Sequence, residues 1–195
     1  MELSKRVLPV AFYTRSPETV ARDLLGKRLI RVLDGNRLGG IVAETEAYHG
    51  LSDPASRAYR GKKRYNSPMW DEPGRLFVYN VHKYWMLNVI AHEPSEVGGV
   101  LFRAIEPTTG AKMMRTLRPV ADDKELTSGP GKLSLALGVT RELNGYFVTD
   151  PDSPVIILDA PCVDEYCTSH RIGVMRDLPE ELRFYVPGNR FVSRG

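Results

Sequence analysis

This sequence has no long hydrophobic run. None of its apolar stretches approaches the roughly 20 residues that a helix needs to span a bilayer, and the first 15 residues hold too short an apolar core for a secretory signal. We therefore expect a cytosolic protein that does not contact a membrane. Its 195 residues, 42% hydrophobic and 26% charged, suit one globular domain spanning residues 1–195.

Cysteine is also scarce. The two cysteines, Cys162 and Cys167, lie too close together to close a stabilising disulfide loop. A structural zinc site would need more ligands than nearby Asp164 and His170 supply. We expect neither a disulfide nor a metal site, and we interpret both cysteines as small buried apolar residues.

Acidic residues are missing from one long segment. Residues 54–70 contain no Asp or Glu and lie in a loop, 49–75, with little periodicity and many turn formers. The segment's basic residues are Arg57, Arg60, Lys62, Lys63 and Arg64, interleaved with Tyr59, Tyr65 and Trp70. A net charge of +3 would not by itself indicate nucleic acid, but clustered cations can neutralise phosphates and aromatic rings can stack on bases. The alternative is a solvated basic loop.

The remaining pattern predicts many short elements, as 14 prolines and 17 glycines indicate. Ser16 and Pro17 predict the start of a helix that Gly26 can end. Strands are expected at 28–33 and 38–48 around a turn at 34–36, at 75–91 around a turn near 80–83, and at 98–107, 153–159, 171–174 and 181–193. Helices are expected at 107–118 and from residue 130. We therefore predict an α+β domain.

The expected strand 38–48 carries carboxylates inside an apolar run. Side chains alternate across a strand, which predicts one face with Ile41, Ala43, Thr45 and Ala47 and another with Val42, Glu44, Glu46 and Tyr48. A half-exposed strand with solvated glutamates is the simple interpretation. The alternative is that the carboxylate face lines an active site.

Two further features bear on charge. Arg103 lies between Phe102 and Ala104 in the apolar strand 98–107, where a cation needs a partner such as one of the strand carboxylates. The expected helix start at Pro130 follows a glycine-rich turn, so its backbone N–H groups could hold a phosphate with help from Lys132.

The order of motifs resembles the alkyladenine (3-methyladenine) DNA glycosylase family. The motifs are "LLGKRLIR", "ETEAY", "DPASRAYRG", "PGRLFVY", "LNV", "LFRAIEP", "SGPGKL", "RIGV" and "LRFYV", spread over residues 11–193. The resemblance implies a curved antiparallel β-sheet with flanking helices. It also implies hydrolytic excision of alkylated or deaminated purines from duplex DNA, with water as nucleophile, no cofactor and no strand cleavage. We expect a monomer, cytoplasmic and nucleoid-associated, or nuclear if the source has a nucleus.

The resemblance implies roles for residues that match the family motifs. Glu46 of "ETEAY" is expected to be the general base, and Arg103 of "LFRAIEP" to help hold the nucleophilic water. Tyr48 is expected to form one wall of the base pocket, and Asn88 of "LNV" to tune which purines enter. The backbone of Ile172, Gly173 and Val174 in "RIGV" is expected to line the pocket.

The sequence departs from the family pattern at two places. Arg57 stands where the family usually has a histidine that contacts the flipped base. A permanent cation there should disfavour cationic bases such as 7-methylguanine relative to neutral hypoxanthine. The hairpin that usually carries a wedging tyrosine reads "NVHKY", so we expect His82 as the wedge, with Tyr84 as the alternative and Lys83 on phosphate. The other expected DNA contacts are Arg60, Lys62, Lys63, Arg64 and Lys132.

Three alternatives remain at this point. The segment 126–139 followed by Asp150 resembles the helix–hairpin–helix glycosylases, which are largely helical. A damaged-DNA binding protein without catalysis would fit the departures at Arg57 and His82. A generic RNA-binding or hydrolase domain with chance similarity is the third.

Overall fold

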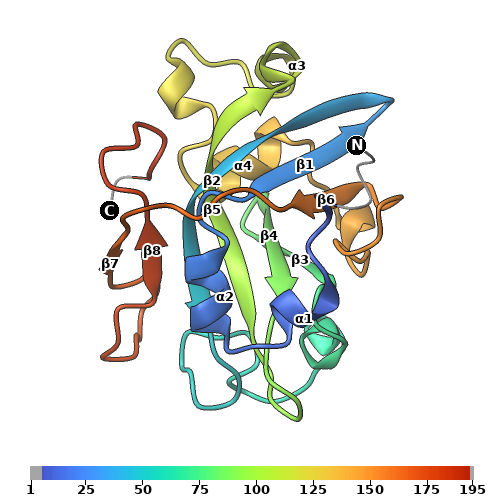
Figure 1. Cartoon of the computed structure of the whole chain (residues 1–195). Coiled ribbons are helices and arrows are strands. Elements are labelled where there is room, and N and C mark those ends of the chain that lie inside the picture. The colour runs from blue at the N-terminus through green and yellow to red at the C-terminus, as the bar shows by residue number, and fades with distance from the viewer. Residues whose placement is uncertain (1–5, 194–195) are drawn as a thin grey trace.

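The computed structural model describes residues 6–193. They form an α+β fold in which one curled antiparallel sheet is flanked by short helices (Figure 1). The strand order is β3-β4-β5-β2-β1-β6, with β8 pairing to β2 and β7 to β8. This confirms the predicted fold class and excludes the largely helical alternative. Among the helices of residues 6–193, none is both long and apolar enough to cross a membrane.

The first hairpin and its preceding helix follow the sequence signals closely. The helix α2 covers Pro17–Asp23, and the Ser16 hydroxyl accepts a hydrogen bond from the Thr19 backbone N–H, as an N-cap should. Strands β1, Arg28–Leu33, and β2, Asn36–Tyr48, are joined by Asp34 and Gly35. Both turn residues have positive φ, which matches the two-residue turns that join twisted strands.

The other elements are as follows. Strands are β3 Leu76–Val81, β4 Tyr84–Ile90, β5 Gly99–Thr109, β6 Val155–Leu158, β7 Cys167–Ser169 and β8 Arg183–Tyr185. Helices are α1 Val10–Tyr13, α3 Ala111–Leu117 and α4 Pro130–Ala136, with single 3₁₀ turns at Ser67–Trp70, Asp123–Glu125 and Arg141–Leu143. Residues 50–66 form turns without a helix or strand, as predicted for the basic loop.

The pairing of the long strands β2 and β5 shifts register at three places, and the two shifts beside Glu44 compensate each other. Val42 pairs with Ile105 but Glu44 pairs with Ala104, so Ala43 is an extra residue in β2. Thr45 then pairs with Phe102, so Arg103 is an extra residue in β5. Such bulges bend a strand and redirect its side chains, and they are frequent beside active sites.

These bulges overturn part of the predicted alternation in β2. Val42 was expected on the carboxylate face, but it belongs to the main core, together with Ala47 beyond the bulge. Ile41 and Ala43, expected beside Ala47, are outside that cluster. The prediction was wrong because it assumed an uninterrupted period of two, which the extra residue Ala43 breaks.

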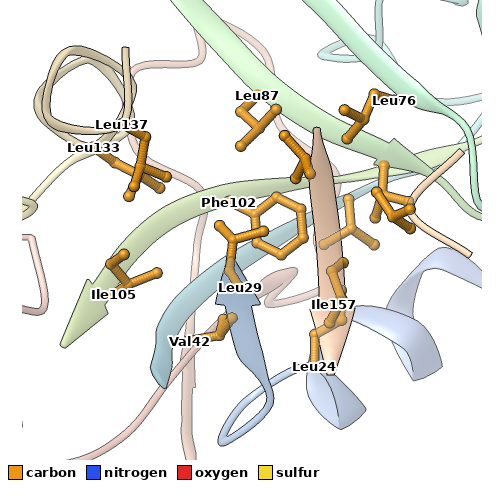
Figure 2. Packing of buried hydrophobic residues seen from close by; sticks show 14 of the residues in the cluster. Leu24, Leu29, Val42, Leu76, Leu87, Phe102, Ile105, Leu133, Leu137 and Ile157 are labelled. Atoms are coloured by element: carbon orange, nitrogen blue, oxygen red, sulfur yellow. The ribbon is translucent and has the colours of Figure 1, made fainter. Parts of the chain in front are cut away.

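The main hydrophobic core fills the inside of the curled sheet. Phe102 of β5 has no exposed surface and lies at the centre, with Leu133 and Leu137 approaching from α4 and its C-cap (Figure 2). Leu24, after α2, and Ile157, on β6, close the other side. Burying one such leucine contributes roughly 2 kcal/mol to folding. This packing therefore stabilises the two long strands that carry the carboxylates.

Three smaller expectations were wrong. The helix predicted for 107–118 begins only at Ala111, because β5 continues to Thr109 and Gly110 turns the chain with φ 71°. Residues 171–174 form a turn rather than a strand, with Gly173 at φ 77°. Cys162 is exposed and Cys167 half-buried rather than buried, and both thiols are free.

Candidate active site

A cavity of about 580 Å³ opens beside the end of β2 and the first half of β5. Its lining comes from β2, the 54–60 loop, the β3–β4 hairpin, β5, the start of α4 and the 172–176 turn. The lining residues are Tyr48, Pro54, Ala55, Arg57, Tyr59, Arg60, Tyr79, Val81, Met86, Leu101, Arg103, Pro130, Ile172, Gly173, Val174, Met175 and Arg176. This size suits a small-molecule ligand such as a single base.

Glu46 lies immediately behind this lining and has no exposed surface. Its Oε1 accepts a hydrogen bond from the Ile172 backbone N–H at 2.8 Å and forms an ion pair with Arg103 Nη1 at 3.0 Å. Its Oε2 accepts a hydrogen bond from the Tyr48 hydroxyl at 2.8 Å. A carboxylate offers about four lone-pair positions, so Glu46 retains capacity to accept from a further donor.

Glu44 is equally buried but has a different set of partners. Its Oε1 accepts from Arg103 Nε, Arg183 Nε and the Ser193 hydroxyl, each at 2.7 Å. Its Oε2 accepts from the Ser193 backbone N–H at 2.6 Å. Two of its four donors are buried guanidinium groups, so Glu44 holds cations in place. This agrees with the expectation that Arg103 pairs with a strand carboxylate.

The charges in this group support each other's ionisation. Burial opposes a charge on Glu44, but Arg103 and the Ser193 hydrogen bonds outweigh it and hold the pKa of that carboxyl below its usual value. Burial likewise opposes the charge on Arg103, and the two carboxylates overcome it, so the pKa of its guanidinium is raised. Burial and the nearby Glu46 raise the pKa of Tyr48 well above 10.0, so its hydroxyl keeps the proton that it donates.

Arg171 anchors the turn that supplies the Ile172 N–H. Its Nη1 and Nη2 donate to both oxygens of Asp53 at 2.6 and 2.8 Å, and its Nε donates to Asp177 at 2.8 Å. The guanidinium also lies 4.6 Å from the centre of the Tyr48 ring. Because Asp53 and Arg171 have no exposed side-chain surface, this bidentate pair fixes both the 172–176 turn and the ring of Tyr48.

Tyr48, Tyr79 and Arg57 are among the side chains that line the cavity. Tyr48 was predicted as a wall, and Tyr79 of β3 joins it in the lining. Arg57 stacks on the Tyr79 ring with 4.6 Å from its guanidinium carbon to the ring centre. Arg57, Ile172, Gly173 and Val174, all predicted for the base pocket, thus line this cavity, and the Ile172 N–H points at Glu46.

The predicted wedge lies at the tip of the β3–β4 hairpin. His82 and Lys83 form its two-residue turn, both are exposed, and His82 has φ 54°. Val81, directly before the turn, lines the cavity. Tyr84, the alternative wedge, is half-buried against Gly131 of α4, which leaves His82 as the more accessible of the two.

The predicted cations differ in their surroundings. Arg60 lines the cavity, and Lys62, Lys63 and Arg64 are exposed on the loop beside it. Lys132 instead pairs with Glu125. The charge of Lys132 is therefore partly neutralised. A phosphate bound at the start of α4, as expected from the sequence, would compete with the Glu125 carboxylate for this lysine.

Asn88 is the one predicted pocket residue outside the lining. Its side chain is buried, and its amide donates to the Phe77 and Met86 carbonyls at 3.0 and 3.1 Å. Two residues next to it do line the cavity, Met86 on the same strand and its β5 partner Leu101. Within residues 6–193, no three His, Cys, Asp or Glu side chains gather as metal ligands would.

Sequence reasoning missed several residues that build the site, among them Arg171, which anchors the 172–176 turn. Tyr79 was visible as the last aromatic of "PGRLFVY", and Asp53 as the start of a turn in "SDPAS". Asp53 accepts from the backbone N–H groups of His49 and Ala55, which holds the loop start in place. Arg183 and Ser193 had no local signal, because their partner Glu44 lies 139 and 149 positions earlier.

Comparison with known proteins finds one family, in a family model and in individual relatives alike. A model of the methylpurine-DNA glycosylase family matches residues 11–190. A relative from Aeropyrum pernix is 41% identical over 97% of this chain and 94% of its own. Relatives from Bacillus subtilis and Carboxydothermus hydrogenoformans are each 38% identical, over 100% and 96% of this chain and 100% and 99% of their own. All three carry the name "Putative 3-methyladenine DNA glycosylase".

Proposed function

The chain belongs to the methylpurine-DNA glycosylase family, and on this basis we propose that it hydrolyses the N-glycosidic bond of damaged purines in duplex DNA. The product is an abasic site in an uncut strand. The observation that carries the proposal is the buried carboxylate Glu46, held beside a base-sized cavity by Arg103, Tyr48 and Ile172. The substrates would be 3-methyladenine, 7-methylguanine, hypoxanthine and ethenoadenine.

The first step is extrusion of the damaged nucleotide. Unpairing and unstacking cost a few kcal/mol, and less where the base is damaged or mismatched. His82 at the exposed hairpin tip would fill the gap left in the stack, while Lys83 and the basic residues of the 57–64 loop contact phosphates. The extruded purine would enter between the rings of Tyr48 and Tyr79, which both line the cavity.

The second step is attack by water at the sugar. As the bond from the base to C1′ breaks, its electron pair leaves with the base and positive charge develops on the sugar. A fixed carboxylate stabilises that charge and takes a proton from the water that bonds to C1′. Glu46 has spare acceptor capacity for this water, and Arg103 fixes the direction of its Oε1.

A lysine nucleophile would lead to a Schiff base and strand cleavage. Within residues 6–193, the cavity lining contains tyrosine and arginine but no lysine. This composition favours a monofunctional enzyme that uses water.

The test is single-turnover base release from a duplex oligonucleotide with one hypoxanthine, with alkali revealing abasic sites. Wild type should release the base, and Glu46→Gln should lose at least about a hundred-fold in rate while it still binds the duplex. Glu106→Gln is the matched control, since among residues 6–193 the Glu106 side chain accepts only from Asn189 and is absent from the cavity lining. If wild type binds hypoxanthine and 7-methylguanine duplexes but releases neither base, the chain is a lesion-binding protein and the proposal fails.

A further inference from the structure

Ser193 is the point at which the C-terminal segment meets the buried charges of the site. Its side chain is buried, and its hydroxyl accepts a hydrogen bond from Arg103 Nη2 at 3.0 Å while donating to Glu44 Oε1 at 2.7 Å. Its backbone N–H donates to Glu44 Oε2 at 2.6 Å, and its carbonyl accepts from Arg183 Nη2 at 2.9 Å. All three polar groups of one residue thus bond to the same ion network.

The guanidinium of Arg103 is held at three corners. Its Nε donates to Glu44, its Nη2 donates to Ser193, and its third nitrogen, Nη1, forms the ion pair with Glu46 Oε1 at 3.0 Å. A guanidinium is planar and rigid. Because Nε and Nη2 are both fixed, the position of Nη1 is fixed as well, and with it the contact to the carboxylate behind the cavity.

The local backbone of Arg103 makes this support necessary. Arg103 is the extra residue of the bulge in β5, so the strand register does not orient its side chain as it does for Phe102 or Ala104. Without the Ser193 hydroxyl, Arg103 Nη2 would remain buried but would lose its hydrogen-bond acceptor. Without that acceptor the guanidinium could turn about its bond to Glu44 and move Nη1 away from Glu46.

We propose that Ser193 is a positioning residue for base excision: its hydroxyl sets the orientation of Arg103, and through it the geometry of Glu46 and the attacking water. This inference rests on the proposed glycosylase function. Ser193 is absent from the cavity lining, so it acts on the rate of bond cleavage and not on binding of the lesion.

The experiment compares variants of the full chain in single-turnover release of hypoxanthine, together with their affinity for the same duplex. Ser193→Ala should lower the rate constant roughly ten- to a hundred-fold, the size expected when a reacting group is misplaced by a remote change, and leave affinity unchanged. Ser193→Thr keeps the hydroxyl and should restore most of the rate. Ser193→Cys, with a weak donor and acceptor, should fall between them.

A matched control separates positioning from stability. Asn189 lies in the same C-terminal segment and bonds to Glu106 and to the Phe191 N–H, away from Arg103. Asn189→Ala should lower the unfolding temperature without lowering the rate of the folded enzyme. A second readout is coupling: in an Arg103→Lys background, which lacks Nη2, Ser193→Ala should have little further effect on rate.

Several results would overturn the inference. One is a Ser193→Ala enzyme that cleaves at the wild-type rate, and another is full additivity with Arg103→Lys. Where Ser193→Ala does not fold, Ser193→Cys takes its place, and a wild-type rate in that variant counts against the inference equally. An active wild type with unaffected Ser193 variants overturns this inference alone, whereas an inactive wild type overturns the proposed function and this inference together.

Discussion

The floor and the rim of the cavity have opposite physical characters. We define the floor as the buried network of Glu44, Glu46, Arg103, Arg183 and Ser193, of which Arg103 lines the cavity and the others lie behind the lining. We define the rim as Arg57, Arg60, His82 and Lys83. The floor is buried, its charges balance, and almost every donor has an acceptor within 3.0 Å. The rim is exposed on loops and turns, and all its charged or titratable groups are basic.

This difference suits the floor to the placement of reacting groups and the rim to the binding of DNA. A buried ion network is held rigidly, because breaking one pair leaves an uncompensated charge. Precise placement is what bond cleavage requires. An exposed basic surface has little fixed geometry but attracts a polyanion over a distance. Changes in the floor should therefore affect stability and rate, and changes in the rim should affect DNA binding and lesion preference.

The largest effect on stability is expected from Glu44→Gln. Removing this charge leaves Arg103 and Arg183 buried without their shared counter-ion, so the free energy of unfolding should fall by about 3 kcal/mol. Urea unfolding at neutral pH measures it. The control Glu106→Gln weakens one hydrogen bond to Asn189, so its free energy of unfolding should fall by about 1 kcal/mol or less. If both variants lose the same free energy of unfolding, Glu44 contributes no more to stability than a single partly buried hydrogen bond does.

A smaller effect is expected from acid in the wild-type protein. The pKa of Glu44 is lowered in the folded state, so its contribution to stability is fully present above the unfolded value, 4.5, and is lost as pH falls through the lower folded value. Urea midpoints measured from neutral pH to about pH 3 should fall more steeply for wild type than for Glu44→Gln. Parallel curves for the two proteins would show that other groups carry the acid sensitivity.

The smallest effect is expected at the rim, from Arg57→His. Removing a permanent cation from the cavity should raise the rate of 7-methylguanine release relative to hypoxanthine by roughly five-fold, as about 1 kcal/mol of like-charge repulsion is relieved. Stability should change by less than about 1 kcal/mol, since only the stack on Tyr79 is lost. Arg57→Lys keeps the charge and should keep the wild-type ratio. A wild type that clearly prefers 7-methylguanine would contradict this reading of Arg57.

Much of the fold and part of the site were predictable from local patterns. Ser16 with Pro17 marked α2, Asp34 with Gly35 marked the first turn, and the apolar run around Phe102 marked β5. The motifs "ETEAY" and "LFRAIEP" singled out Glu46 and Arg103, which the fold brings into contact. Their roles in catalysis stay predictions until base release is measured.

The sequence by itself determined the type of most elements, the N-cap of α2 and the residue types available for chemistry, because these depend on neighbours within a few positions. Only the tertiary structure decided which way Arg103 points, because the paired bulges at Ala43 and Arg103 arise from how two long strands fit together. It also decided that Glu44 accepts from two arginines and Ser193, whereas Glu46 accepts from Tyr48, Ile172 and Arg103 beside the cavity. That difference depends on Arg183 and Ser193, which reach the carboxylates from the other end of the chain.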